Sequence, residues 1–293
     1  MDRSRTTLTD ITRPDREPLV MVTAYDAASA RLTDEAGVDL ILVGDTLAEF
    51  ALGHDSTVAV TVDEMLHHCR AVTRTRPRAL VVGDMPLGSY QVSDEEAVRN
   101  AIRFVKEGGV DAVKIEGGAV RAQTAQAIVE AGVAVMGHVG FTPQSAVSFG
   151  SHIVTGRDAE AGIALYRDAL ALERAGCFSI VLEAVVRAVA SRITAELVVP
   201  TIGIGAGDGC SGQVLVFHEL TGIHSGPSPR FVRRYGEAGA EISRAIADYA
   251  RDVRTRAYPD KEHAYLMPGE EIARFDHALA AERRDAGLRT RTA

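Results

Sequence analysis

The chain has 293 residues, and its 40 Asp and Glu outnumber its 32 Lys and Arg, with no long basic block, so a nucleic-acid partner is not expected. Its three cysteines are widely spaced and form no CxxC motif, which indicates neither a disulfide framework nor a thiolate zinc site and suits a reducing cytoplasm. No apolar run approaches the roughly 20 residues of a membrane span, and the polar start MDRSRTTLTD is unlike a signal peptide, so we expect a cytoplasmic protein without a membrane partner.

Short apolar runs alternate with amphipathic stretches along the chain, and each run has the length of a buried strand. The runs are LVMVTAYD (19–26), LILVGD (40–45), LVVGDM (80–85), AVKIEGG (112–118), VAVMGHVG (133–140), FSIVLEA (178–184), PTIGIGAG (200–207) and QVLVFHEL (213–220). Continuous apolar runs are typical of parallel strands, which are buried on both faces. The pattern predicts a repeating βα unit with eight strands.

The intervening stretches have helix signals. In SDEEAVRNAIRFVKEGG, Ser93 is placed to cap a helix, with Glu96 three residues later and Gly108 or Gly109 to end it. The turns that enter the strands are short. Three segments that leave the strands are long and rich in Gly, Ser, Pro and His, at 46–60, 85–92 and 141–156.

This alternation predicts an α/β fold, with a (β/α)8 TIM barrel as first choice and a doubly wound open sheet as the alternative. The GIGAG at 203–207 lacks the GxGxxG spacing of a nucleotide-binding fold, which weakens the alternative. In a barrel, the long loops that follow the strands lie together on one face, where active sites form.

The predicted domain organisation is an N-terminal extension at 1–17, a barrel catalytic domain at 18–263 and a charged C-terminal tail at 264–293. Beyond Pro227 the sequence predicts a long charged helical stretch to about Ala257. We expect the tail to pack peripherally or to be partly disordered, without forming a second domain.

Acidic residues recur at the ends of the predicted strands. They are Asp26, Asp45, Asp84, Glu116 and Glu183, and His138 has the equivalent place in the fifth run. Because the strand ends of a barrel meet at one mouth, these carboxylates would form a cluster that repels itself unless it holds a cation. Mg²⁺ suits such a cluster, since it binds through one or two carboxylates and keeps its other positions for water or a chelating substrate.

Each of these residues also has a structural interpretation. Any one acid at a strand end could cap a helix, Lys114 and Glu116 could form a structural pair, and His138 could be a satisfied core histidine. Neighbouring His67 and His68 lie on a predicted helix and point apart, so we interpret both as structural. The joint pattern favours function for Asp45, Asp84 and Glu116, and a separate acid–base role for Glu183.

At these residues the sequence resembles the ketopantoate hydroxymethyltransferase family, from about Pro18 to His263. The resemblance is carried by MVTAYD, ILVGDT, LGHDST, VTVDEMLHHCRAV, GDMPLGSY, AVKIEGG, VMGHVGFTPQS, LALERAGCFSIVLE, PTIGIGAG, CSGQVLV and PRFVRRY, in this order. It implies a (β/α)8 barrel of the phosphoenolpyruvate/pyruvate superfamily type and a homo-oligomer, often a decamer.

The resemblance also implies an activity. Family members transfer a hydroxymethyl group from the co-substrate 5,10-methylenetetrahydrofolate to the enolate of 3-methyl-2-oxobutanoate, which yields 2-dehydropantoate for pantothenate synthesis. By the resemblance, Glu183 is the proton acceptor and Mg²⁺ is held at Asp45 and Asp84 with Glu116. The implied contacts to the 2-oxo acid are Asp45, Thr46, Asp84, Lys114 and His138.

The sequence departs from the family pattern around the substrate. Where the family usually reads GDSLGM, this chain reads GDTLAEF (44–50), and the usual Cys-Val-Pro after the base is AVV (184–186). The same chemistry on a different 2-oxo acid is therefore an alternative. Two others are a Mg²⁺-dependent C–C lyase of the same superfamily and a catalytically silent oligomeric paralogue.

Overall fold

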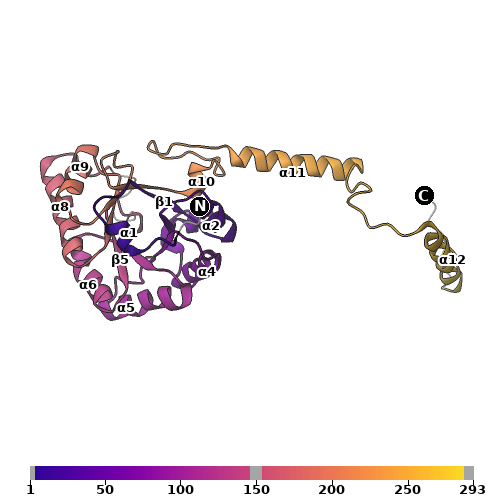
Figure 1. The fold of residues 1–293 in the computed structure, drawn as a ribbon, viewed down its shortest axis with the longest axis horizontal. Coiled ribbons are helices and arrows are strands. Elements are labelled where there is room, and N and C mark those ends of the chain that lie inside the picture. The colour runs from indigo at the N-terminus through magenta and orange to yellow at the C-terminus, as the bar shows by residue number, and fades with distance from the viewer. Residues whose placement is uncertain (1–3, 146–153, 287–293) are drawn as a thin grey trace. The chain divides into compact units, whose positions relative to one another are not determined.

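The computed structural model describes residues 4–145 and 154–286, so part of the predicted loop 141–156 lies outside the described residues. Eight parallel strands pair in sequence order, and the last pairs with the first to close a barrel (Figure 1). This confirms the predicted α/β barrel and rules out the open sheet.

The strands lie where the apolar runs predict them. Their bounds are β1 (Leu19–Thr23), β2 (Leu40–Val43), β3 (Leu80–Asp84), β4 (Ala112–Glu116), β5 (Ala134–Gly140), β6 (Ser179–Glu183), β7 (Thr201–Ile204) and β8 (Gly212–Leu215). The second half of the eighth run was wrongly interpreted as strand, because Phe217–Leu220 forms the short helix α10. The Phe217 N–H donates to Thr23 Oγ1 at 3.0 Å, and so it is not available to a sheet.

Helix α1 precedes β1, and the helices that follow the first six strands surround the barrel. Their bounds are α1 (Leu8–Thr12), α2 (Ala27–Glu35), α3 (Leu47–Phe50), α4 (Val62–Thr73), α5 (Asp94–Arg103), α6 (Ala122–Glu130), α8 (Ala159–Arg174) and α9 (Arg187–Glu196), with short turns η1 (Thr57–Ala59), η2 (Phe104–Gly108), η3 (Ala119–Arg121) and η4 (Pro143–Ser145). β7 and β8 are joined by a loop, so the strict alternation of strand and helix ends there.

Local capping explains where the helices start. Ser93 Oγ accepts from the Glu96 N–H at 3.1 Å and begins α5, as the sequence predicts. The helix continues into the π-turn η2 and ends at Gly109, whose φ of 74° suits glycine. Helix α4 begins with a reciprocal capping box between Thr61 and Glu64.

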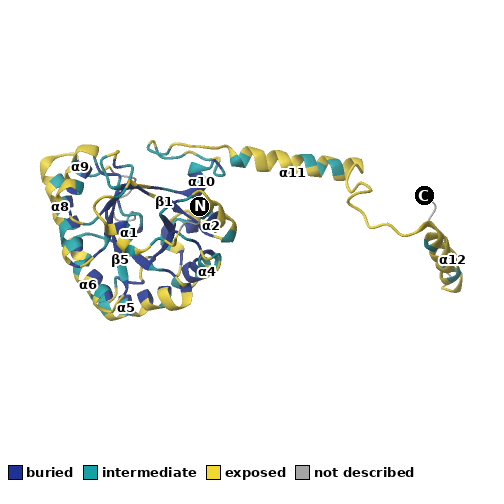
Figure 2. Ribbon diagram, in the orientation of Figure 1, coloured by how far each residue is buried: buried dark blue, intermediate teal, exposed yellow. Residues whose placement is uncertain are grey.

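The core has two layers, because successive strand residues point to opposite faces of the barrel wall. Figure 2 shows the buried strands surrounded by helices whose outer faces are exposed. The inner layer fills the barrel; its members include Met21, Leu42, Leu80, Val82, Met136, Val181, Ile202 and Val214, with Ile11 of α1. The outer layer packs between strands and helices. Because both layers pack along the length of the strands, the residues at the carboxyl ends of the strands are available to form a site.

The chain divides into two compact units, residues 1–237 and residues 238–293. The second unit contains α11 (Ala238–Thr255) and α12 (Gly269–Asp285), neither of which has a buried residue. A helix therefore occupies much of the predicted tail, while the predicted domain boundaries at 17 and 263 stay predictions. Among the described residues, no helix is both long and apolar enough to cross a bilayer.

Candidate functional site

The strand register brings the predicted polar residues together. Asp84 of β3 lies opposite Lys114 of β4, and Glu116 lies opposite His138 of β5. Glu183 of β6 is in register with the last residue of β5. Because side chains alternate along a strand, Lys114 and Glu116 point to the same side. Pairing of the strands therefore places these side chains at one mouth of the barrel.

Lys114 is the cation that contacts most members of the group. Its Nζ lies 2.6 Å from Asp84 Oδ1, 3.5 Å from Glu116 Oε1 and 3.4 Å from His138 Nδ1. All four side chains are buried, so water does not screen these contacts. Lys114 therefore neutralises part of the acidic cluster from within.

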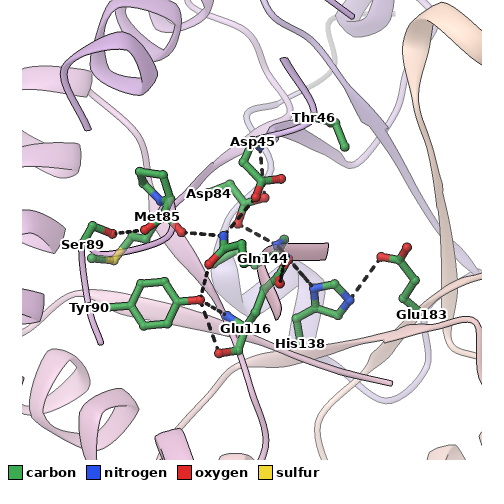
Figure 3. Close-up of polar contacts among 12 residues, drawn as sticks. Asp45, Thr46, Asp84, Met85, Ser89, Tyr90, Glu116, His138, Gln144 and Glu183 are labelled. Atoms are coloured by element: carbon green, nitrogen blue, oxygen red, sulfur yellow. Dashed lines mark hydrogen bonds and ion pairs between the residues drawn. The ribbon is translucent and has the colours of Figure 1, made fainter. Parts of the chain in front are cut away.

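His138 lies between two carboxylates. Its Nδ1 is 3.3 Å from Glu116 Oε1, and its Nε2 is 3.2 Å from Glu183 Oε2. The ring thereby connects the acidic cluster to Glu183 (Figure 3). Glu183 is the more exposed end of this row. The histidine contributes to the site and is not an isolated core residue.

Asp45 and Thr46 come from the turn between β2 and α3. The Asp45 N–H donates to Asp84 Oδ2 at 3.2 Å, which holds the two acidic residues side by side. Thr46 Oγ1 lies 2.7 Å from the hydroxyl of buried Tyr25. On this side of the mouth, His218 stacks on the Tyr25 ring with centroids 5.3 Å apart.

All seven predicted site residues line one cavity of about 820 Å³: Asp45, Thr46, Asp84, Lys114, Glu116, His138 and Glu183. Glu49 and Phe50, which depart from the family pattern, line it as well. Its lining also includes Phe141, His224 and Phe231. A cavity of this size can hold a small acid together with part of a larger second molecule.

The acidic side of the cavity carries excess negative charge. Burial, together with the charges of Asp84 and Glu116, raises the pKa of Asp45 well above its ordinary value. Burial also raises the pKa of Asp84, with Glu116 adding to it and Lys114 opposing it. Burial and mutual repulsion therefore disfavour the charged forms of both aspartates, and Lys114 offsets this only in part.

The pKa values of Lys114, Glu116 and His138 are shifted mainly by their charged neighbours, against the effect of burial. Burial opposes the charged form of Lys114, but Asp84 and Glu116 raise its pKa above the ordinary value. Burial likewise works against ionisation of Glu116, yet Lys114 and His138 lower its pKa. Burial and Lys114 disfavour the imidazolium of His138, while Glu116 and Glu183 raise its pKa to about 9. These three groups form a charged row beside the aspartates.

The donor set fits a hard divalent cation. Asp45 and Asp84 offer carboxylate oxygens at the position where negative charge is in excess, and Mg²⁺ needs only one or two such ligands. Within the described ranges, no group of three His, Cys, Asp or Glu side chains could hold a metal ion. Glu116 is engaged by Lys114 and His138, so its predicted place in the metal site stays a prediction.

The structure separates one strand-end acid from the others. Asp26 caps helix α2, where its Oδ1 accepts from the Ser29 N–H at 2.7 Å, and it does not line the cavity. Three contributors were missed from the sequence: Tyr25, Tyr90 and Gln144. Each lies in a motif quoted for the resemblance, MVTAYD, GDMPLGSY or VMGHVGFTPQS, but uncharged residues give no signal in a search for acids.

Comparison with known proteins identifies the family of the chain. The sequence model of the family "Ketopantoate hydroxymethyltransferase" matches residues 5–261. The chain is 53% identical over 252 residues to 3-methyl-2-oxobutanoate hydroxymethyltransferase of Heliobacterium modesticaldum, covering 86% of this chain and 91% of that protein. It is 51% identical over 265 residues to the protein of the same name from Moorella thermoacetica, and the match covers 90% of this chain and 98% of that protein.

The barrel also resembles a solved structure of 2,3-dimethylmalate lyase, described as a member of the PEP mutase/isocitrate lyase superfamily. The TM-score is 0.57 at 18% identity, and the match covers 96% of this chain and 93% of that one. At this identity the likeness shows the fold alone. The matches to the family model and to the curated relatives show that the chain belongs to the ketopantoate hydroxymethyltransferase family of transferases.

Proposed function

We propose that the chain transfers a hydroxymethyl group from 5,10-methylenetetrahydrofolate to 3-methyl-2-oxobutanoate, giving 2-dehydropantoate for pantothenate synthesis. The observation that carries this proposal is the shared cavity, which is lined by Glu183 together with a buried aspartate pair and Lys114. Relatives about 50% identical along most of their length bear the name of this activity.

Asp45 and Asp84 would hold Mg²⁺, and Glu116 lies in the same acidic cluster. When bound, the cation would withdraw electron density from the 2-oxo and carboxylate oxygens of the substrate and so favour loss of the neighbouring proton. Lys114 supplies a fixed positive charge for the substrate carboxylate. Thr46 offers a hydroxyl at the cavity wall, and His138 a ring nitrogen.

Glu183 would act as the base. It would take the proton from C3 of the 2-oxo acid, and the resulting enolate carbon would form a bond to the one-carbon unit delivered by the folate. One water molecule supplies the new hydroxyl group, and tetrahydrofolate is released. His138, 3.2 Å from Glu183, keeps the carboxylate facing the cavity.

The cavity volume of about 820 Å³ exceeds what a five-carbon acid requires, which supports a second substrate in the same space. A homo-oligomeric state, a decamer in the family, and a cytoplasmic location remain predictions of this proposal. The different-substrate alternative has one observation in its favour, since Glu49 and Phe50 line the cavity in place of the residues usual in the family.

The experiment is deuterium exchange at C3 of 3-methyl-2-oxobutanoate in D₂O, followed by proton NMR with Mg²⁺ and without folate. We expect exchange by the wild type and a loss of about 10²–10⁴-fold in Glu183→Gln, the usual contribution of a general base. Exchange of other 2-oxo acids alone would establish the different-substrate alternative. Release of a C–C cleavage product would favour the lyase, and no reaction with any 2-oxo acid would favour the silent paralogue.

A further inference from the structure

Gln144 is a buried, uncharged residue at the centre of the acidic cluster (Figure 3). Its Nε2 donates to Asp45 Oδ2 at 3.0 Å and to the Met85 carbonyl oxygen at 3.0 Å. Its backbone N–H donates to Glu116 Oε2 at 3.1 Å. One residue thus contacts two of the carboxylates predicted for the metal site, together with the peptide that follows Asp84.

The orientation of the Gln144 amide follows from its neighbours. The backbone carbonyl of Met85 presents only an acceptor oxygen, so the NH₂ end of Gln144 must face it, and the same NH₂ group reaches Asp45. With the opposite orientation, the amide oxygen would face a carboxylate and a carbonyl, which is repulsive in a buried site. The observed orientation uses both amide protons and leaves Oε1 pointing away from the cluster.

Tyr90 fixes that orientation from the other side. Its hydroxyl accepts from the Glu116 N–H at 3.0 Å and donates to Gln144 Oε1 at 2.6 Å, a closer acceptor than the Glu116 carbonyl oxygen at 3.3 Å. Tyr90 itself is buried at the end of the loop that follows β3, where the Asn100 Nδ2 donates to the Ser89 carbonyl oxygen at 2.7 Å. The chain of bonds therefore runs from a fixed loop, through Tyr90 and Gln144, to Asp45.

A glycine lets the backbone reach this place. Gly140 ends β5 with a φ of 100°, and a Cβ there would lie 2.2 Å from the Glu183 carbonyl oxygen. The following N–H, of Phe141, donates to that same oxygen at 2.9 Å. The chain then turns across the mouth, and the short turn η4 presents Gln144 to the cluster.

We propose that Gln144, held by Tyr90, is a positioning residue for the cation site. It occupies one oxygen of Asp45 and so directs the remaining lone pairs of that carboxylate, with Asp84, toward a shared divalent ion. This inference rests on the metal site of the proposed function. Partners of this kind typically change metal affinity by about 10–100-fold when they are removed.

The test is isothermal titration calorimetry of Mg²⁺ into the metal-free full-length chain, without substrate or folate. We expect Gln144→Met, which keeps the volume and removes the amide, to weaken Mg²⁺ binding by about 10–100-fold. Tyr90→Phe should weaken it in the same direction. The double variant should bind no more weakly than Gln144→Met, because both changes break the same chain of bonds.

Two controls separate positioning from folding. Gln126→Met on α6 and Tyr166→Phe on α8 make the same chemical changes away from the mouth, and both should bind Mg²⁺ as the wild type does. Thermal unfolding checks that each variant is folded. If folded Gln144→Met and folded Tyr90→Phe both keep Mg²⁺ affinity within twofold, the inference is wrong, and a wild-type chain that binds no Mg²⁺ overturns it as well.

The deuterium exchange assay gives an independent result. In one outcome the wild type binds Mg²⁺, Gln144→Met and Tyr90→Phe bind it more weakly, and no 2-oxo acid exchanges deuterium. This outcome would support the role of Gln144 and contradict the proposed reaction. In the other outcome the wild type exchanges deuterium and both variants keep the Mg²⁺ affinity of the wild type. This outcome would support the proposed reaction and contradict the role of Gln144. The two proposals can therefore fail separately.

Discussion

The hydroxyl groups of Tyr25 and Thr46 lie 2.7 Å apart at the rim of the acidic cluster. Tyr25 is buried, its carbonyl oxygen is 2.6 Å from His68 Nδ1 of helix α4, and its ring stacks on His218, so both its backbone and its ring are held. Thr46 carries a methyl group where the family usually has serine. The bond to Tyr25 therefore sets which direction the Thr46 hydroxyl presents to the cavity.

This arrangement predicts a coupled effect on substrate binding. Thr46→Val keeps the shape and removes the hydroxyl, so the KM for the 2-oxo acid should rise by about tenfold, the equivalent of one hydrogen bond of about 1.4 kcal/mol. Tyr25→Phe should raise KM by a smaller factor. Steady-state kinetics of both single variants and the double variant measure the coupling, which would be absent if the changes were additive.

We expect Phe50, which departs from the family pattern, to influence which 2-oxo acids the cavity accepts. Phe50 packs against His218 at 5.7 Å and His224 at 5.2 Å between ring centroids, so it forms a rigid part of the wall. Phe50→Val should open this wall and improve kcat/KM for acids with longer side chains relative to 3-methyl-2-oxobutanoate. The ratio should change by about tenfold, as expected for one or two methylene groups. A panel of 2-oxo acids, compared with the wild type, provides the measurement.

Helix α4 should lose stability when its cap is removed. Thr61 Oγ1 accepts from the Glu64 N–H at 3.3 Å, and Glu64 Oε2 accepts from the Thr61 N–H at 2.8 Å. Thr61→Ala should therefore lower the free energy of unfolding by about 1 kcal/mol at pH 7. Urea denaturation measures the loss, and a change within experimental error would show that tertiary packing alone holds the helix start.

The same capping box has a pH dependence. Bonds from Thr61 lower the pKa of Glu64 below its ordinary value of 4.5. A depressed carboxyl pKa stabilises the fold fully above 4.5 and loses that contribution as the pH falls below it. Glu64→Gln should remove this part of the acid sensitivity between pH 5 and about 3, seen as a smaller difference between the urea midpoints at the two pH values.

The thiols are predicted to be unreactive in the folded chain. Burial raises the pKa of Cys177 to about 12, and burial also raises the pKa of Cys69 and of the half-buried Cys210. At pH 8 iodoacetamide should modify Cys210 first and slowly, because the thiolate is the reacting form. Mass spectrometry after timed labelling detects this order, and labelling in urea, where all three should react, is the control.

Much of the fold could be predicted because hydrophobic pattern and sheet geometry act over short distances. The strand runs, the Ser93 cap and the stop at Gly109 all follow from local rules, and the structure confirms them. The prediction of strand at the end of the eighth run was wrong. There the Phe217 N–H donates to Thr23, 194 residues away in sequence, and no local pattern shows that contact.

The charged part of the site could be found from the sequence for the same reason. Acids at strand ends converge by topology, whereas Asp26, at an equivalent strand end, forms a helix cap instead. Gln144 could not be found in this way. Its proposed role depends on a loop that crosses the mouth and on a bond to Tyr90, 54 residues earlier.

The register of β4 against its neighbours also bears on how the barrel folds. Lys114 and Glu116 pair across the sheet with Asp84 and His138, so the charges match only in one alignment. A slip of one residue would turn both charged side chains into the apolar layer beneath the helices and bring Val113 and Ile115 to the inside. Burying unpaired charges is far more costly than misplacing aliphatic groups. The charged residues of the candidate site therefore also favour one register of β4, because a misaligned barrel would have to bury them unpaired.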